Sequence, residues 1–271
     1  MSVYLFQDQA EFRLQSLEAD KLWFSYRTCL NDPFDCRAEL INDIDERQSA
    51  HGHDVDDLRS LFRKYYEGGL NGRWDCGLLN SKFVNSIVEW CDESISGAQL
   101  KIRLEELLDQ IGVRCFFLNE PTNVLMWAHY AGNHKGYCVQ YSNPSISFLP
   151  MSYSNTSVPI YISDLLFSSR AYINRVLNTK YSSWAYENET RITVLPSQNA
   201  DIHNTGFTES LSQFRMQVEA IWLGLNVPEP TRIKLCDLCL ARGWRVHEAM
   251  IDKLSGSMIR FSELDLKSFY K

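Results

Sequence analysis

The sequence has no hydrophobic run that approaches the roughly 18 residues needed to span a membrane. Its first residues, MSVYLFQDQAEFR, lack the basic region and the long apolar segment of a signal peptide. Positive charge is also scarce, because 34 acidic residues outnumber 27 basic residues and the formal net charge is −7. We therefore expect a cytoplasmic protein without a membrane partner. The net charge disfavours general nucleic-acid binding but leaves a local basic patch open.

Several motifs that would identify a function are missing. The chain contains no P-loop, no GxGxxG, no GxSxG, no repeats and no low-complexity tract. Its eight cysteines lie in a long chain without an export signal, so we expect them to be reduced. Cys236 and Cys239 form a lone CxxC inside a helical pattern, which favours core packing and leaves metal binding open.

The length and composition predict one domain, residues 1–271, with a sizeable core, since 45% of the residues are hydrophobic. Short apolar runs alternate with helical patterns, which predicts an α+β fold: a mixed, mostly antiparallel sheet with flanking helices. Residues 41–111 are charged and contain three helical patterns, so we interpret them as an all-helical insertion. The first of these patterns, residues 54–67, ends at Gly68 and Gly69.

Residues 113–141 are the stretch around which we expect the chain to be organised. They predict a buried strand, a helix capped by Asn123 and ended by Gly132, and a second strand over residues 137–141. Aromatic and titratable side chains gather here, and this density suggests a site. The candidates are Trp127, His129, Tyr130, His134 and Lys135. Core packing of Trp127, His129 and Tyr130 is the alternative.

A second polar segment, LNDPFDC at residues 30–36, has the composition of a rigid turn. Such a turn would present Asn31, Asp32 and Asp35 to a site. Turn formation alone is an equally good explanation, because Asn, Asp and Pro generally form turns.

The third segment, residues 181–195, alternates from Trp184 onward and predicts a strand. Period two places Trp184 and Tyr186 on one face, and Glu187, Glu189 and Arg191 on the other. Two carboxylates about 7 Å apart repel, which raises the pKa of at least one of them. They could act as an acid–base pair or stabilise charge, or they could lie on a solvated face with a surface ion pair.

The remaining patterns predict a helix over residues 165–177 and a buried strand over residues 218–224. A helix then begins near Pro228 and is stopped by Gly243, and a final antiparallel pair follows. Residues 207–222 as a whole are ambiguous between helix and strand.

The order and spacing of several of these motifs resemble a bacterial family known as domain of unknown function 2971. The motifs are LNDPFDC (30–36), RCFFLNE (114–120), LMWAHYAGNHKGYCVQY (125–141), WAYENETR (184–191) and VEAIWLG (218–224). The resemblance covers nearly the whole chain. It implies a bacterial, cytoplasmic setting, and an effector or toxin role, often beside phage-defence genes.

The layout more weakly resembles that of ADP-ribosyltransferases, whose late strand carries Glu-x-Glu. By this resemblance Glu189 would bind a ribose hydroxyl, Glu187 would act on the acceptor, and Trp127 and Tyr130 would enclose the nicotinamide of NAD. The first strand lacks the usual His or Arg, and Arg27 is a candidate substitute.

Three hypotheses follow. The first is an NAD-using transferase or glycohydrolase centred on Glu187, Glu189, Arg191, His129 and Tyr130. The second is a non-catalytic sensing or interaction module of a defence system, with a partner protein. The third is a metal-dependent, nuclease-like hydrolase, for which the chain offers no compact ligand spacing. The residues themselves identify no cofactor.

Overall fold

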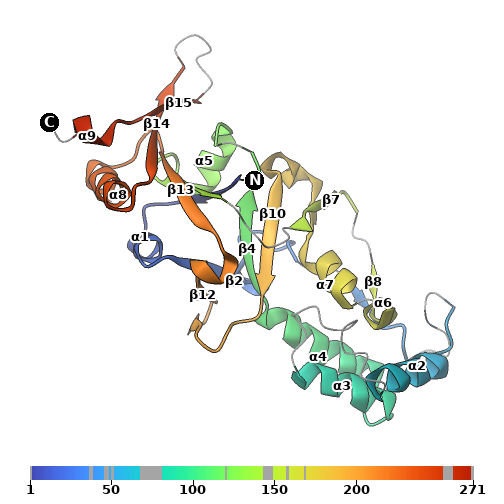
Figure 1. Ribbon diagram of the computed structural model, residues 1–271. Helices are drawn as coiled ribbons and strands as arrows, with labels where there is room; N and C mark the ends of the chain where they lie inside the picture. The colour runs from blue at the N-terminus through green and yellow to red at the C-terminus, as the bar shows by residue number, and fades with distance from the viewer. Residues whose placement is uncertain are drawn as a thin grey trace.

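The computed structural model describes residues 2–36, 39–45, 49, 52–67, 81–119, 121–142, 149–156, 159–167, 169–252 and 259–269. A large sheet occupies the middle of the molecule, as Figure 1 shows, and helices cover both of its ends. Among the described strands, this sheet has one parallel pairing, that of β13 with β14. The predicted α+β class with a mixed, mostly antiparallel sheet is therefore confirmed.

The main sheet has eleven strands among the described residues. In spatial order, nine of them are β11 (Asp201–His203), β12 (Gly206–Ser210), β2 (Lys21–Tyr26), β4 (Gly112–Phe117), β1 (Ser2–Gln7), β5 (Tyr137–Ser142), β13 (Gln217–Leu223), β14 (Arg245–Ile251) and β15 (Ile259–Glu263). The other two are β10 (Glu189–Val194), which pairs with β4, and β6 (Leu149–Pro150), which pairs with β10. Two small parallel pairs lie apart from it: β3 (Leu40–Ile41) with β8 (Ile160–Tyr161), and β7 (Ser152–Ser154) with β9 (Thr179–Tyr181).

The sheet divides at β4. One edge of β4 pairs with β10 along its whole length. The other edge pairs with β2 at Val113 and with β1 only at Phe117. The strands β1 and β2 therefore separate along β4, and α1 (Glu11–Glu18) connects them.

The strand predicted over residues 137–141 is confirmed as β5, and its side chains alternate between two apolar clusters. Tyr137, Val139 and Tyr141 belong to the core that includes α8 (Glu229–Arg242). Cys138 belongs to the core beneath α5 (Val124–Tyr130). The caps of α5 also follow the prediction: the Asn123 side chain accepts a hydrogen bond from the Leu125 N–H, and Gly132 has φ +55°.

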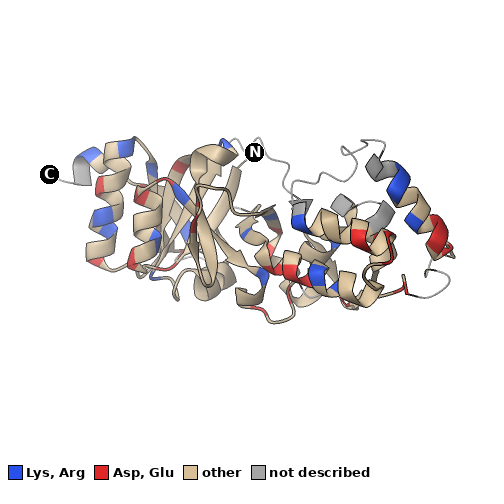
Figure 2. Cartoon of the chain, turned by 90° about the horizontal axis from the view of Figure 1, so that it is seen from below, with Lys and Arg blue, Asp and Glu red and all other residues tan. Residues whose placement is uncertain are grey.

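Between residues 41 and 111 the described helices are α2 (Val55–Glu67), α3 (Ser81–Cys91) and α4 (Gly97–Gln110). They lie at one end of the molecule (Figure 1) and share one apolar cluster with α6 (Ile162–Phe167) and α7 (Ser169–Leu177). Gly68 and Gly69 lie outside the described residues. In the view of Figure 2, Lys and Arg are interspersed with Asp and Glu along the chain. None of the described helices is long and apolar enough to cross a membrane.

Two predicted elements are wrong in part. The helix expected over residues 165–177 is divided into α6 (Ile162–Phe167) and α7 (Ser169–Leu177). The strand expected from Trp184 onward begins only at Glu189, because a 3₁₀ helix, η3 (Ser182–Glu187), precedes it. Asn188 joins them in the left-handed conformation, with φ 45°. The ambiguous residues 207–222 form β12, the 3₁₀ helix η4 (Leu211–Phe214) and β13.

The C-terminal predictions are confirmed. The helix α8 ends at Gly243, which has φ +70°, and β14 pairs antiparallel with β15. Cys236 and Cys239 lie on the buried face of α8 and pack in the core of the sheet.

Candidate functional site

The turn at Asn188 brings the two glutamates of the third segment onto one lysine. Because Glu187 ends η3 and Glu189 begins β10, their side chains do not follow a strand face. Instead, Lys180 Nζ donates to Glu187 Oε2 at 2.7 Å and to Glu189 Oε2 at 3.0 Å. Lys180, on the short strand β9, was not among the predicted site residues, because it directly precedes the third segment and belongs to no motif.

Arg191 completes a buried cluster that we call the charge cluster: Asp35, Lys180, Glu187, Glu189 and Arg191. Arg191 donates to both carboxylate oxygens of Asp35, at 2.9 and 2.5 Å, and its Nε–H donates to Glu189. It also donates to the Leu177 carbonyl at 2.6 Å. Every side chain of the cluster is at most 3% exposed. Three carboxylates face two cations, so the fully ionised cluster carries one excess negative charge.

The excess charge is relieved at Glu187. Burial raises the pKa of Glu187 to about 7, against the opposing effect of Lys180. Burial alone would also raise the pKa of Glu189, but Arg191 and Lys180 outweigh it and lower that pKa to about 2. Burial opposes the charge of Lys180, yet the three carboxylates raise its pKa above the ordinary value. Near neutral pH, Glu187 is thus the carboxyl group of the cluster that exchanges a proton.

Tyr130 connects Glu187 to the surface. Its hydroxyl donates to Glu187 Oε1 at 2.5 Å and also interacts with the Asn31 side chain. The tyrosine is half-buried, and its ring packs on Phe117 with 5.5 Å between the ring centroids. Tyr130, Asn31 and the exposed His129 line the same groove. Glu187 itself is fully buried and reaches the groove only through Tyr130.

The groove has a volume of about 930 Å³ and follows the division of the sheet. Its walls come from β1, α1, β2 and β4, with the loop at Asn31 and the end of α5 at one extremity. His129 packs edge-on against Tyr130 and Trp184 and is tilted against Tyr186, with centroid separations of 6.3, 6.4 and 6.5 Å. These rings form an aromatic rim beside the Tyr130 hydroxyl, and Trp184 also lies 4.9 Å from Lys180 Nζ.

The turn of residues 30–36 contributes to both features. Asn31 lies at Tyr130, and Asp35 is bound by Arg191. Asp32 is buried and accepts the Phe34 N–H at 2.9 Å, the local hydrogen bond expected of a turn-forming aspartate.

The other candidates lie away from the charge cluster. Arg27 pairs with Asp109 of α4 at 2.6 Å. Trp127 is fully buried and donates to the Pro121 carbonyl at 2.7 Å. The His134 ring is stacked on Trp127, and burial lowers its pKa. Lys135 is exposed, and neither it nor His134 lines the groove.

A metal-binding group is not found within the described part of the chain: no three His, Cys, Asp or Glu side chains there are grouped to hold an ion. In the charge cluster, Lys180 and Arg191 occupy the positions beside the carboxylates where a cation would bind.

Comparison with known proteins relates part of the chain to a known family. Residues 126–192 match the family described as "Protein of unknown function (DUF2971)", which confirms the resemblance over about a quarter of the chain. The matched segment runs from α5 to β10 and contains Tyr130, Lys180, Glu187, Glu189 and Arg191. No curated protein and no solved structure matches the chain.

Proposed function

We propose that the protein is a bacterial effector enzyme that uses NAD in an ADP-ribosyltransferase or glycohydrolase reaction, with Tyr130 and Glu187 as its acid–base pair. The observation that carries this proposal is the 2.5 Å hydrogen bond from the groove-lining Tyr130 hydroxyl to the buried Glu187. A general base works best when its pKa lies near the working pH, and the pKa of Glu187 is about 7.

The proposed reaction breaks the bond between the ribose C1′ and the nicotinamide nitrogen, and the bonding electrons leave with nicotinamide. The oxygen of water or of an acceptor hydroxyl forms the new bond to C1′. Its proton passes to the Tyr130 oxygen while Tyr130 gives its own proton to ionised Glu187. Proton transfer through a positioned side chain contributes typically 10²–10⁴-fold to a rate.

Glu189 takes a different role in this proposal from the one implied by the ADP-ribosyltransferase resemblance. Arg191 and Lys180 already bind its carboxylate, which is buried behind the groove. We assign Glu189 as a positioning residue that holds Lys180, and through it Glu187. The exposed His129 and the ring of Tyr186 take the place of the buried Trp127 beside the nicotinamide.

The groove supports a substrate of this size. Its volume is within the usual range for small-molecule sites, roughly 300–1,000 Å³. The lining combines aromatic rings, which can stack on a base, with cationic side chains, which can approach phosphates. These are Phe12, Trp23, Phe117 and Tyr130, and Arg13, Lys21 and Arg114.

One observation favours a second candidate, a non-catalytic module of a defence system that binds a partner protein. Each carboxylate of the charge cluster already has a cationic partner, so the cluster is complete without a ligand. On this alternative the cluster only fixes η3 and β10 in place.

Tyr130→Phe tests the proposal, because it removes the hydroxyl and keeps the ring. Wild-type protein and variant are incubated with NAD, and released nicotinamide is measured by mass spectrometry. We expect release by the wild type and a loss of about 10²–10⁴-fold in the variant. Tyr181→Phe is the matched control, because Tyr181 is 52% exposed and does not line the groove, and it should behave as wild type.

Two outcomes contradict the proposal in different ways. If the wild type releases no nicotinamide, with or without an acceptor protein, NAD is not the substrate. If Tyr130→Phe matches the wild type in rate, the acid–base role of Tyr130 and Glu187 is wrong. A toxic wild type whose toxicity survives in Tyr130→Phe would favour the non-catalytic module.

A further inference from the structure

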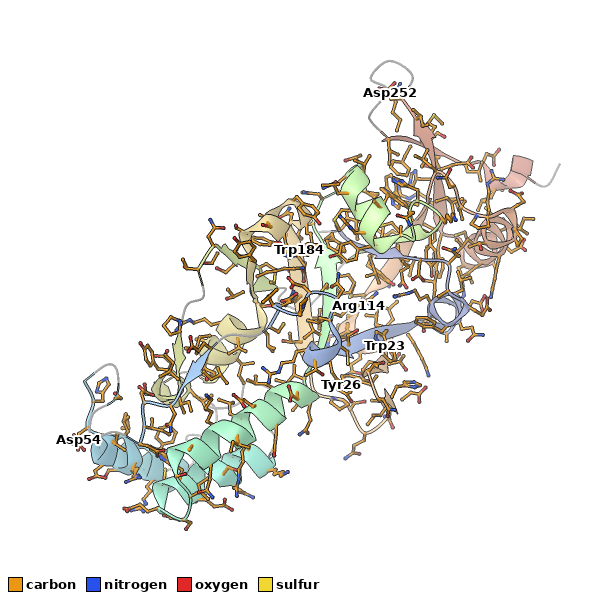
Figure 3. All side chains as sticks on the ribbon, turned by 180° about the vertical axis from the view of Figure 1, so that it is seen from behind. Trp23, Tyr26, Asp54, Arg114, Trp184 and Asp252 are labelled. Carbon is orange, nitrogen blue, oxygen red and sulfur yellow. The ribbon has the colours of Figure 1, made fainter. Side chains whose placement is uncertain are left out.

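A buried arginine lies in the groove, on the opposite face of the sheet from the charge cluster. Arg114 follows Val113 on β4, in the interval where β1 and β2 separate. Its side chain lies in the middle of the molecule, beside the strand that carries Trp23 (Figure 3), and both residues line the groove. Arg114 is only 9% exposed.

Arg114 has no anionic partner within the described residues. Its Nε–H has no hydrogen-bond acceptor there, and no carboxylate forms an ion pair with it. The ionisable groups that most affect its charge are Tyr141, Arg13, Cys115 and Tyr137, and Arg13 acts against it. Burial lowers the pKa of the guanidinium to about 10, so Arg114 is still a cation at neutral pH.

Two further hydroxyl groups are also buried without a hydrogen-bond partner in the described residues, those of Tyr137 and Thr208. Thr208 lines the same groove, and Tyr137 is close enough to Arg114 and Arg13 for their charges to act on it. Buried polar groups are nearly always hydrogen-bonded in folded proteins, and a buried unpaired charge is especially costly. A guanidinium and the Thr208 hydroxyl without partners in one groove, with the Tyr137 hydroxyl near the same arginine, indicate a ligand that supplies several acceptors.

We propose that Arg114 and Arg13 form a subsite for the phosphate group of a small molecule, with Thr208 and Tyr137 as further donors. The planar guanidinium can donate two parallel hydrogen bonds to one phosphate, which leaves other oxygens for the hydroxyls. Arg13 contributes a second positive charge, although Asp8 already binds its Nε at 2.9 Å. Trp23 lies in the same groove, where an aromatic base attached to the phosphate could stack.

This inference rests on the proposed function only in naming NAD as the phosphate-bearing molecule. The subsite itself is tested by binding rather than by turnover, so the two proposals can fail separately. Tyr130→Phe should retain phosphate binding even where it abolishes nicotinamide release.

The experiment measures the binding of inorganic pyrophosphate and of AMP by calorimetry, and the melting temperature without ligand. Arg114→Met removes the charge and keeps an unbranched side chain. We expect it to weaken the binding of both probes roughly tenfold or more, as for loss of a charge-assisted hydrogen bond. We also expect a higher melting temperature for the ligand-free variant, because a buried unpaired charge has been removed.

Arg245→Met is the control, because Arg245 is exposed on β14 and does not line the groove. It should bind both probes as the wild type does. Arg114→Lys keeps the charge without the paired donors and should fall between wild type and Arg114→Met. Wild-type protein that binds neither probe, or Arg114→Met that binds both as tightly as wild type, would overturn the subsite. Binding of AMP with no binding of pyrophosphate would also overturn it, since recognition would then not depend on phosphate.

Discussion

Cys115 and Arg114 are neighbours on β4, but their side chains lie beside two different arrangements of buried charge. The Cys115 side chain faces the charge cluster, and its thiol donates to Glu189. In that cluster two cations and three carboxylates bind one another. On the Arg114 side, a guanidinium that is also buried has no carboxylate partner within the described residues. Burial of charge costs desolvation free energy in both places. In the charge cluster the ion pairs offset that cost, whereas at Arg114 no described residue does so. The comparison indicates that one region is organised by the chain itself and that the other is completed by a ligand.

We expect the largest effect on stability when one of the two cations of the charge cluster is removed. Arg191→Met leaves Asp35 and Glu189 buried with Lys180 as the one cationic partner that the described residues offer them. Breaking a buried ion pair on one side typically costs about 3–5 kcal/mol, and we expect a loss of that size in the free energy of unfolding. Urea denaturation followed by circular dichroism measures it.

Arg175→Met is the matched control. Arg175 pairs with Asp164 at 3.2 Å, but its side chain is 46% exposed, and surface pairs contribute about 0–1 kcal/mol. If both variants lost the same free energy of unfolding, the buried ion pairs of the charge cluster would contribute no more than a surface pair. The contrast between the charge cluster and Arg114 would then be wrong.

A smaller effect follows from the two glutamates, whose pKa values are shifted in opposite directions. The pKa of Glu187 rises from 4.5 to about 7 on folding, so between these values the folded chain binds more protons than the unfolded chain. Its contribution to stability is therefore present below pH 4.5 and is lost as the pH rises through 7. At about 1.4 kcal/mol per pKa unit, the loss is of the order of 3 kcal/mol.

Glu189 has the opposite dependence, because its pKa falls from 4.5 to about 2 on folding. Its contribution is present above pH 4.5 and is lost as the pH falls toward 2. The difference between wild type and Glu187→Gln in urea denaturation from pH 4 to pH 8 isolates the Glu187 effect. Glu187→Gln should flatten the slope between pH 4.5 and 7, and an unchanged slope in that variant would assign the titration to another group.

Much of the fold could be predicted because its signals are local. The alternation of β5, the cap of α5 at Asn123 and the end of α8 at Gly243 each depend on a few adjacent residues. The charge cluster could be predicted from the sequence only in part. Asp35, Glu187, Glu189 and Arg191 stood out as charged residues in motifs, but nothing near Lys180 indicates that it would lie between two carboxylates.

The strand expected from Trp184 failed for a physical reason. Alternation of residue types is compatible with a 3₁₀ turn as well as with a strand, and here the aromatic residues pack on His129 rather than on a sheet face. Asn188 carried a usable signal, because asparagine is one of the few residues that adopt the left-handed conformation readily. The unpaired state of Arg114 could not be predicted, since it depends on which residues are absent from its surroundings in three dimensions.

The smallest expected effect concerns the turn that creates the charge cluster. Asn188 has φ 45°, and its side chain donates to Asn119 Oδ1 at 2.9 Å. The left-handed conformation costs an ordinary residue roughly 1–2 kcal/mol, whereas glycine adopts it freely. Asn188→Ala should therefore lower the free energy of unfolding by about 1 kcal/mol, and Asn188→Gly by less, as measured by urea denaturation. If alanine were tolerated as well as glycine, the backbone at Asn188 would not be what directs Glu187 and Glu189 to Lys180, and the η3–β10 junction would have to be held by the ion pairs alone.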